Sequence, residues 1–113
     1  MRLARIYDPP TPADGYRVLV DRLWPRGVSR QHAELDEWAK DAAPSTELRK
    51  AFHGGELDAD AFSAAYRAEL QDSPAVPALR ARIAEHETTT LLTATRDEQH
   101  SYLQVLRDVL EGP

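Results

Sequence analysis

Three side chains near the start of the chain are suited to holding an anionic ligand: Arg22, Trp24 and Arg26. The planar guanidinium group of arginine binds phosphate or carboxylate through two parallel hydrogen bonds. An indole ring offers a flat apolar surface on which part of a ligand can stack. The close spacing of these residues predicts a binding site for an anionic small molecule, of a phosphorylated or nucleotide-like kind.

A second segment, near residue 100, adds a cation and two groups for proton transfer. Arg96 extends the set of candidate ligand-binding arginines, and Asp97 and His100 follow it within four residues. Histidine is the most frequent general acid or base in enzymes, and a carboxylate is a suitable partner for it. Asp97 and His100 are therefore the candidate catalytic residues if the bound molecule is also turned over.

Each of these residues also has a purely structural role open to it. Arg22 and Arg26 could pair with nearby carboxylates such as Asp41, and Trp24 could pack in the core. Asp97 could do no more than cap the helix that follows it, as aspartate often does. Ion pairing and ligand binding by the arginines both remain open at this point.

The usual signatures of catalysis and of cofactor binding are missing from the chain. It has no glycine-rich phosphate loop, no H-E-x-x-H and no G-x-S-x-G. It has no cysteine, which excludes disulfides and thiolate ligands. Asp97 and His100 would supply two metal ligands at most, fewer than a zinc site uses. We expect neither a metal nor another cofactor.

Length and charge narrow the class of protein further. The 113 residues suit a single domain, spanning residues 1–113. The net charge of −5 makes nucleic-acid binding unlikely as a general property. Residues 1–30 nevertheless carry six arginines against three aspartates, which favours a confined anion site. The N-terminus does not resemble a signal peptide, and no apolar stretch approaches the roughly 18 residues of a membrane helix, so we expect a cytoplasmic protein without membrane contact.

The elements that must position these residues follow from hydropathy and from helix caps. Strands are predicted within residues 2–7, 17–21 and 88–95, and a fourth within 35–40 is compatible with the pattern. Helices are expected from about Ser45, from Asp58 or Asp60, from Ser73 and from Asp97. Long helical connections favour parallel strands. The fold class is therefore α/β, with a small, open, mostly parallel sheet of three to four strands flanked by helices, whose carboxyl edge would gather the candidate residues.

Three blocks of the sequence together resemble a known family. Residues 16–27 contain V-D-R-L-W-P-R-G, residues 38–49 contain W-A-K-D and A-P-S, and residues 91–98 contain L-L-T-A followed by R-D-E. On these blocks, which span nearly the whole chain, the sequence is identified as a member of the YeaO-like family, also called domain of unknown function 488. The resemblance implies a compact α/β fold in the cytoplasm of bacteria and archaea, and it brings no established activity.

Three functions are therefore considered. The first is binding of an anionic small molecule, with a possible acid–base enzymatic role. The second is a non-catalytic protein-interaction module, whose partners the sequence does not identify. The third is nucleic-acid binding through the arginines of residues 1–30, with Trp24 stacking on a base. The acidic remainder of the chain makes the third the least favoured.

Overall fold

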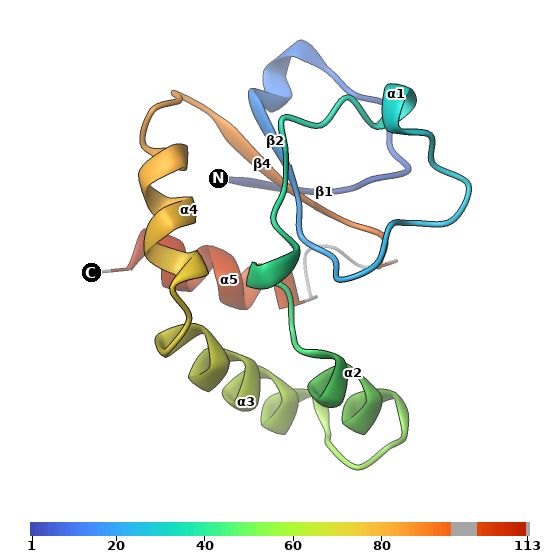
Figure 1. Ribbon diagram of the computed structural model, residues 1–113, viewed down its shortest axis with the longest axis vertical. Coiled ribbons are helices and arrows are strands. Elements are labelled where there is room, and N and C mark those ends of the chain that lie inside the picture. Colours follow the sequence, from blue (N-terminus) through green and yellow to red (C-terminus); the bar gives the residue numbers. More distant parts are fainter. Residues whose placement is uncertain (96–101, 113) are drawn as a thin grey trace.

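A four-stranded, all-parallel sheet forms the centre of the computed structural model, which describes residues 1–95 and 102–112 (Figure 1). The strands are β1 (Arg2–Arg5), β2 (Tyr16–Leu19), β3 (Glu37–Trp38) and β4 (Thr89–Thr93), in the order β1-β4-β2-β3. The predicted α/β class is confirmed, and the short fourth strand lies within the predicted residues 35–40.

Within the described residues, five helices accompany the sheet: α1 (Arg30–Ala33), α2 (Thr46–His53), α3 (Ala59–Gln71), α4 (Ala75–Ile83) and α5 (Tyr102–Glu111). Two single 3-10 turns, η1 (Pro12–Asp14) and η2 (Lys40–Ala42), lie in the connections. The predicted cap of α2 at Ser45 is present, and α3 is capped by Asp58, near which its start was expected. Ser45 Oγ accepts a hydrogen bond from the Leu48 amide at 3.1 Å, and Asp58 accepts one from the Ala61 amide at 2.8 Å. Asp97, the predicted cap of the last helix, lies outside the described residues.

The two faces of the sheet are covered by different kinds of segment. Val18, Val20 and Leu91 point into a core that they share with apolar residues of α3, α4 and α5. Leu19 and Leu92, the alternate residues of the same strands, point into a smaller core. That second core is closed by the segment after β2, through Trp24, Val28, Ala33 and Leu35. Both faces are buried, as is usual for a parallel sheet.

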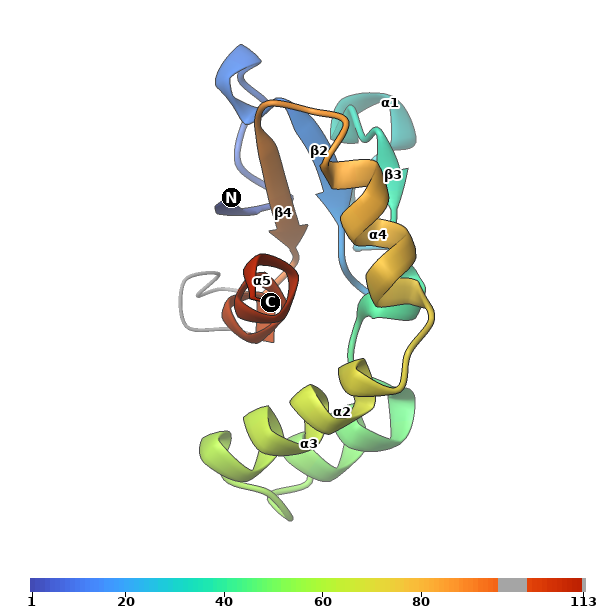
Figure 2. The same ribbon diagram turned by 90° about the vertical axis from the view of Figure 1, so that its left-hand side faces the viewer.

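The connections after β2 and β4 leave these two neighbouring strands on opposite sides of the sheet. The segment after β2 covers the smaller core, whereas α5, which follows β4 in the chain, packs in the larger one. Such a divergence opens a crevice at the carboxyl ends of the two strands, where α/β proteins bind their ligands. In Figure 2 the arrowheads of β2 and β4 point toward α2 and α3, which lie beyond this edge.

None of the described helices combines the length and the apolar character that a membrane span requires.

Candidate functional site

A cavity of about 470 Å³ lies at the carboxyl ends of β2 and β4. The segment after β2 forms one wall, α2 and α3 form another, and the end of β4 with the start of α5 completes it. Its position coincides with the crevice between the diverging connections. The cavity lies at the edge of the sheet where the sequence predicted a site, and it is the candidate functional site.

Aromatic side chains make up much of the wall. Trp24, Phe52 and Phe62 line the cavity, and the Phe52 and Phe62 rings lie 4.5 Å apart between centroids. Trp24 is held in place, because its Nε1–H donates to the carbonyl oxygen of Val28 at 2.6 Å and its ring packs edge-on against Trp38. Phe52 is 36% exposed, so it borders solvent. These walls offer a largely apolar surface to a ligand, as most small-molecule sites do.

Asp21, two residues after β2, supplies the carboxyl group among the described residues that line the cavity. Its Oδ2 accepts the Ala94 amide at 3.0 Å, its Oδ1 lies 3.2 Å from the Thr93 hydroxyl, and Oδ1 also contacts the Tyr102 hydroxyl. Burial raises the pKa of Asp21, and the hydrogen bonds from Tyr102, Ala94 and Thr93 only partly offset this effect. Asp21 therefore holds its proton more tightly than an ordinary aspartate.

Helix α2 brings two nitrogen-bearing side chains to the cavity, Arg49 and His53. They are four residues apart and so share one face of the helix. The guanidinium of Arg49 forms no hydrogen bond or ion pair with any residue in the described part of the chain, although its charge acts on Asp21. Within the described residues the guanidinium group of Arg49 therefore has no fixed partner.

Only some of the site residues predicted from the sequence line the cavity. Trp24 lines the cavity. Arg22 turns away from it and donates to the carbonyl oxygens of Pro44 and Ala43, both at 3.1 Å. It also lies 3.6 Å from a carboxylate oxygen of Asp41, so the ion-pair alternative considered for Arg22 is present.

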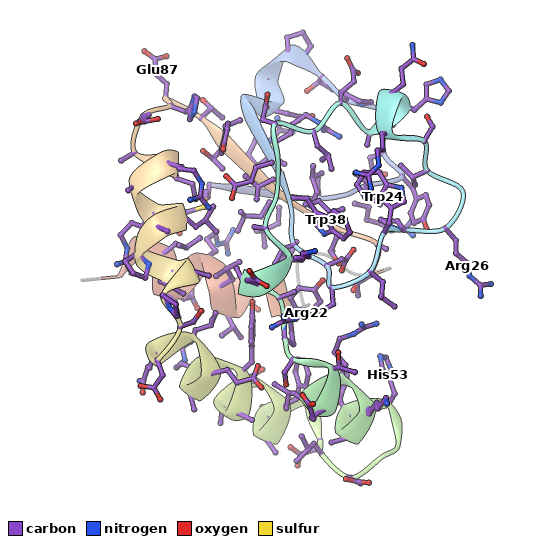
Figure 3. The ribbon with its side chains drawn as sticks, viewed as in Figure 1. Arg22, Trp24, Arg26, Trp38, His53 and Glu87 are labelled. Atoms are coloured by element: carbon purple, nitrogen blue, oxygen red, sulfur yellow. The ribbon has the colours of Figure 1, made fainter. Side chains whose placement is uncertain are left out.

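Arg26 is exposed and extends outward from the molecule, as Figure 3 shows. It is not among the residues that line the cavity. Arg96, Asp97 and His100 lie outside the described residues, so the roles assigned to them stay predictions.

The structural role of Arg22 leads to a testable expectation. Replacing Arg22 with methionine should lower the free energy of unfolding by about 1–2 kcal/mol, since a hydrogen bond from a charged group contributes about 1.5–3 kcal/mol and this side chain is partly exposed. Urea denaturation measures the loss. Arg26→Met serves as the control and should change stability by less than about 0.5 kcal/mol, because Arg26 is a surface residue. Equal losses in the two variants would contradict the structural role of Arg22.

Sequence reasoning did not single out Arg49, His53 or Tyr102, which line the cavity. The i, i+4 spacing of Arg49 and His53 was a usable signal, since it predicts a shared face on a helix that starts at Ser45. Tyr102 fits the apolar stripe of the last helix, and its ring does pack against Tyr66 at 5.8 Å between centroids. Its hydroxyl, however, reaches Asp21. That contact joins residues far apart in the chain, which no local pattern reveals.

Comparisons with known proteins identify the family. Residues 1–113 match a family model described as the inactive DUF488-N3 subclade. The chain is 46% identical over 108 residues to "Uncharacterized protein YeaO" of Escherichia coli strain K12, which covers 96% of this chain and 94% of the relative. It is 41% identical over 112 residues to "Uncharacterized protein Rv3073c" of Mycobacterium tuberculosis strain H37Rv, covering 99% and 94%. No solved structure shows a significant match. The chain belongs to the DUF488 family.

Proposed function

We propose that this protein binds a small organic anion with a flat apolar body in the cavity at the carboxyl ends of β2 and β4. The observation that carries the proposal is the state of Arg49. Its guanidinium lines an aromatic cavity and has no hydrogen-bonding partner within residues 1–95 and 102–112. The ligand class is the one expected from the sequence, but its anionic group is bound by Arg49 in place of the arginines predicted from the sequence.

The chemistry of the walls defines the two parts of the ligand. Trp24, Phe52 and Phe62 favour a planar apolar group, because stacking on these rings removes apolar surface from water. Arg49 favours a carboxylate, sulfonate or phosphate group at one end of that body. An aryl carboxylate and a nucleoside monophosphate both combine these features.

Binding without turnover is the form of the proposal that the family favours, because the matching family model describes an inactive subclade. The possible acid–base role of Asp97 and His100 remains a sequence-based prediction. Once a ligand is known, incubating it with the wild-type protein and assaying for a product tests this catalytic role.

Two fluorescent probes with the same ring system test the proposal. 8-Anilinonaphthalene-1-sulfonate carries a sulfonate, and N-phenyl-1-naphthylamine is its uncharged counterpart. We expect the sulfonate probe to bind more tightly, and Arg49→Met to weaken it by about 10- to 100-fold, because a hydrogen bond to a charged group contributes about 1.5–3 kcal/mol. The affinity for the uncharged probe should change little.

Lys50→Met is the matched control, since Lys50 is exposed on the same helix and does not line the cavity. Equal affinity of the sulfonate probe for Arg49→Met and Lys50→Met would refute the proposal. The same titration of Arg26→Met tests the sequence-based prediction for Arg26. A thermal-shift panel of phosphate, nucleoside monophosphates and aryl carboxylates then narrows the ligand class.

A further inference from the structure

The hydrogen bonds around Asp21 require more protons than the hydroxyl groups can supply. The Tyr102 hydroxyl contacts two oxygens, the carbonyl oxygen of Val20 and Oδ1 of Asp21. Tyrosine has a single hydroxyl proton, and burial together with the neighbouring Asp21 raises the pKa of Tyr102, so this proton stays on. It can be donated to only one of the two oxygens.

The Thr93 hydroxyl does not resolve the shortage. It lies 2.9 Å from the Tyr102 hydroxyl, 3.2 Å from Asp21 Oδ1 and 3.1 Å from the Thr95 hydroxyl. It also accepts the Thr95 amide at 3.2 Å, and it has one proton to give. If Asp21 is ionised and Tyr102 donates to its Oδ1, the hydroxyl oxygen of Tyr102 and the carbonyl oxygen of Val20 face each other without a proton between them.

A proton on Oδ1 of Asp21 satisfies the arrangement. Asp21 then donates to the Tyr102 hydroxyl, and Tyr102 donates to the carbonyl oxygen of Val20. The second carboxyl oxygen still accepts the Ala94 amide. Buried polar groups are almost always paired in this way. The burial of Asp21, which raises its pKa, acts in the same direction.

We propose that the proton on Asp21 determines the charge preference of the cavity, so that binding of an anion at Arg49 is coupled to protonation of Asp21. The coupling rests on the proposed function. With Asp21 protonated, the positive charge of Arg49 is not neutralised and favours an anionic ligand. With Asp21 ionised, its negative charge opposes the positive charge of Arg49 and repels the incoming anion.

Among the described residues that line the cavity, the acid–base group besides Asp21, Arg49 and Tyr102 is His53, which comes from α2, as Arg49 does. Histidine is a residue type whose charge depends on pH. Tyr102 of α5 stays protonated, and Arg22 is directed to the carbonyl oxygens of Ala43 and Pro44. The remaining walls are uncharged in the described part of the chain: those from α3 are Ala59, Phe62 and Ser63, and those after β4 are Ala94 and Thr95. The contributions of Asp21 and His53 to the pH dependence of binding must therefore be separated by mutation.

The decisive experiment is a titration of the sulfonate probe at a series of pH values from about 4.5 to 8.5, over which a sulfonate stays ionised. In the wild type and in His53→Gln, we expect the affinity to fall as pH rises, by up to tenfold per pH unit, because Asp21 loses its proton. In the double variant Asp21→Asn/His53→Gln the affinity should be independent of pH, since the amide can donate to Tyr102 and accept from Ala94 as the protonated acid does. A pH-independent wild type, or a dependence lost in His53→Gln and kept in Asp21→Asn, overturns the coupling.

A measurement without any ligand tests the proton itself. A raised pKa in the folded state means that the contribution of Asp21 to stability is complete below its unfolded pKa of about 4 and is lost as pH rises through the folded value. The urea midpoint of the wild type should therefore fall relative to that of Asp21→Asn as pH rises above about 4. Glu56→Gln, at an exposed carboxylate, should show no such trend.

The two measurements distinguish the possible failures. If the urea midpoints of wild type and Asp21→Asn keep a constant difference, Asp21 is an ordinary carboxylate and the proton assignment is wrong. If the midpoints diverge as expected but neither probe binds, the anion site is wrong and the coupling falls with it, while the proton on Asp21 stands.

Discussion

Replacing Arg17 with alanine should lower the free energy of unfolding by about 3–5 kcal/mol, because it leaves a buried carboxylate without its partner. Arg17 and Asp14 are each 5% exposed, and Nη1 of Arg17 lies 2.5 Å from Oδ2 of Asp14. The same guanidinium donates to the carbonyl oxygens of Ala33 at 2.9 Å and Glu34 at 3.1 Å. The substitution therefore removes the partner of all three groups at once. Urea denaturation at neutral pH measures the effect.

A matched variant separates this buried pair from an exposed one on the same carboxyl group. Arg2 contacts Oδ1 of Asp14 at 3.2 Å, but its side chain is 53% exposed, so Arg2→Ala should cost no more than about 1 kcal/mol. Similar losses of unfolding free energy for Arg2→Ala and Arg17→Ala would show that burial does not determine how much each ion pair with Asp14 contributes to stability.

The cost of Arg17→Ala should also depend on pH. Burial alone would raise the pKa of Asp14, but hydrogen bonds from Thr11 and the ion pair with Arg17 outweigh it and lower the pKa. A lowered folded pKa means stabilisation that is present above the unfolded pKa of about 4 and is lost as pH falls through the folded value. The difference between wild type and Arg17→Ala should therefore shrink in acid.

Gly15→Ala should destabilise the protein by about 3 kcal/mol or more, because it combines backbone strain with a collision. Gly15 has φ 65° and ψ −131°, a conformation that residues with a Cβ rarely adopt. An added Cβ would lie 2.2 Å from the carbonyl oxygen of Thr88. That oxygen accepts the Tyr16 amide at 2.9 Å, where β2 and β4 begin to pair. Relief of the collision would disturb the two central strands.

Gly27→Ala is the control for Gly15→Ala. Gly27 also has a positive φ, of 75°, but nothing lies within 4 Å of an added Cβ. It should cost about 1 kcal/mol from backbone strain alone. Thermal or urea denaturation compares the stability of the two variants. Equal losses of unfolding free energy would show that the contact between the added Cβ and Thr88 does not destabilise the protein.

Much of the fold could be predicted because its signals are local. The apolar residues of β2 and β4 and the caps at Ser45 and Asp58 act within a few residues, and each corresponds to an observed element. The strand β3 was only compatible with the sequence, since two residues carry little pattern. Its pairing with β2 comes from the Asp36 and Ala39 amides, which donate to the carbonyl oxygens of Arg17 and Leu19, and such contacts depend on the distant chain.

The candidate site could be predicted only in its position. Asp21 and Trp24 follow a predicted parallel strand, and the carboxyl edge of a sheet is where a ligand is expected. Arg22 follows the same strand, yet its guanidinium is held by the carbonyl oxygens of Ala43 and Pro44. The direction of a long side chain depends on which acceptors the rest of the chain brings near it, and those lie more than 20 residues away.

Residue types, strand patterns and helix starts were readable from the amino-acid sequence alone, as was the family, because each depends on neighbouring positions or on whole motifs. The assembly of the cavity was decided only in three dimensions. Arg49 on α2 and Tyr102 on α5 line the same cavity as Asp21 because two helices distant in the chain close over the ends of β2 and β4. The strand order β1-β4-β2-β3 inserts the last strand between the first two, and this non-local pairing creates the divergence in which the cavity forms.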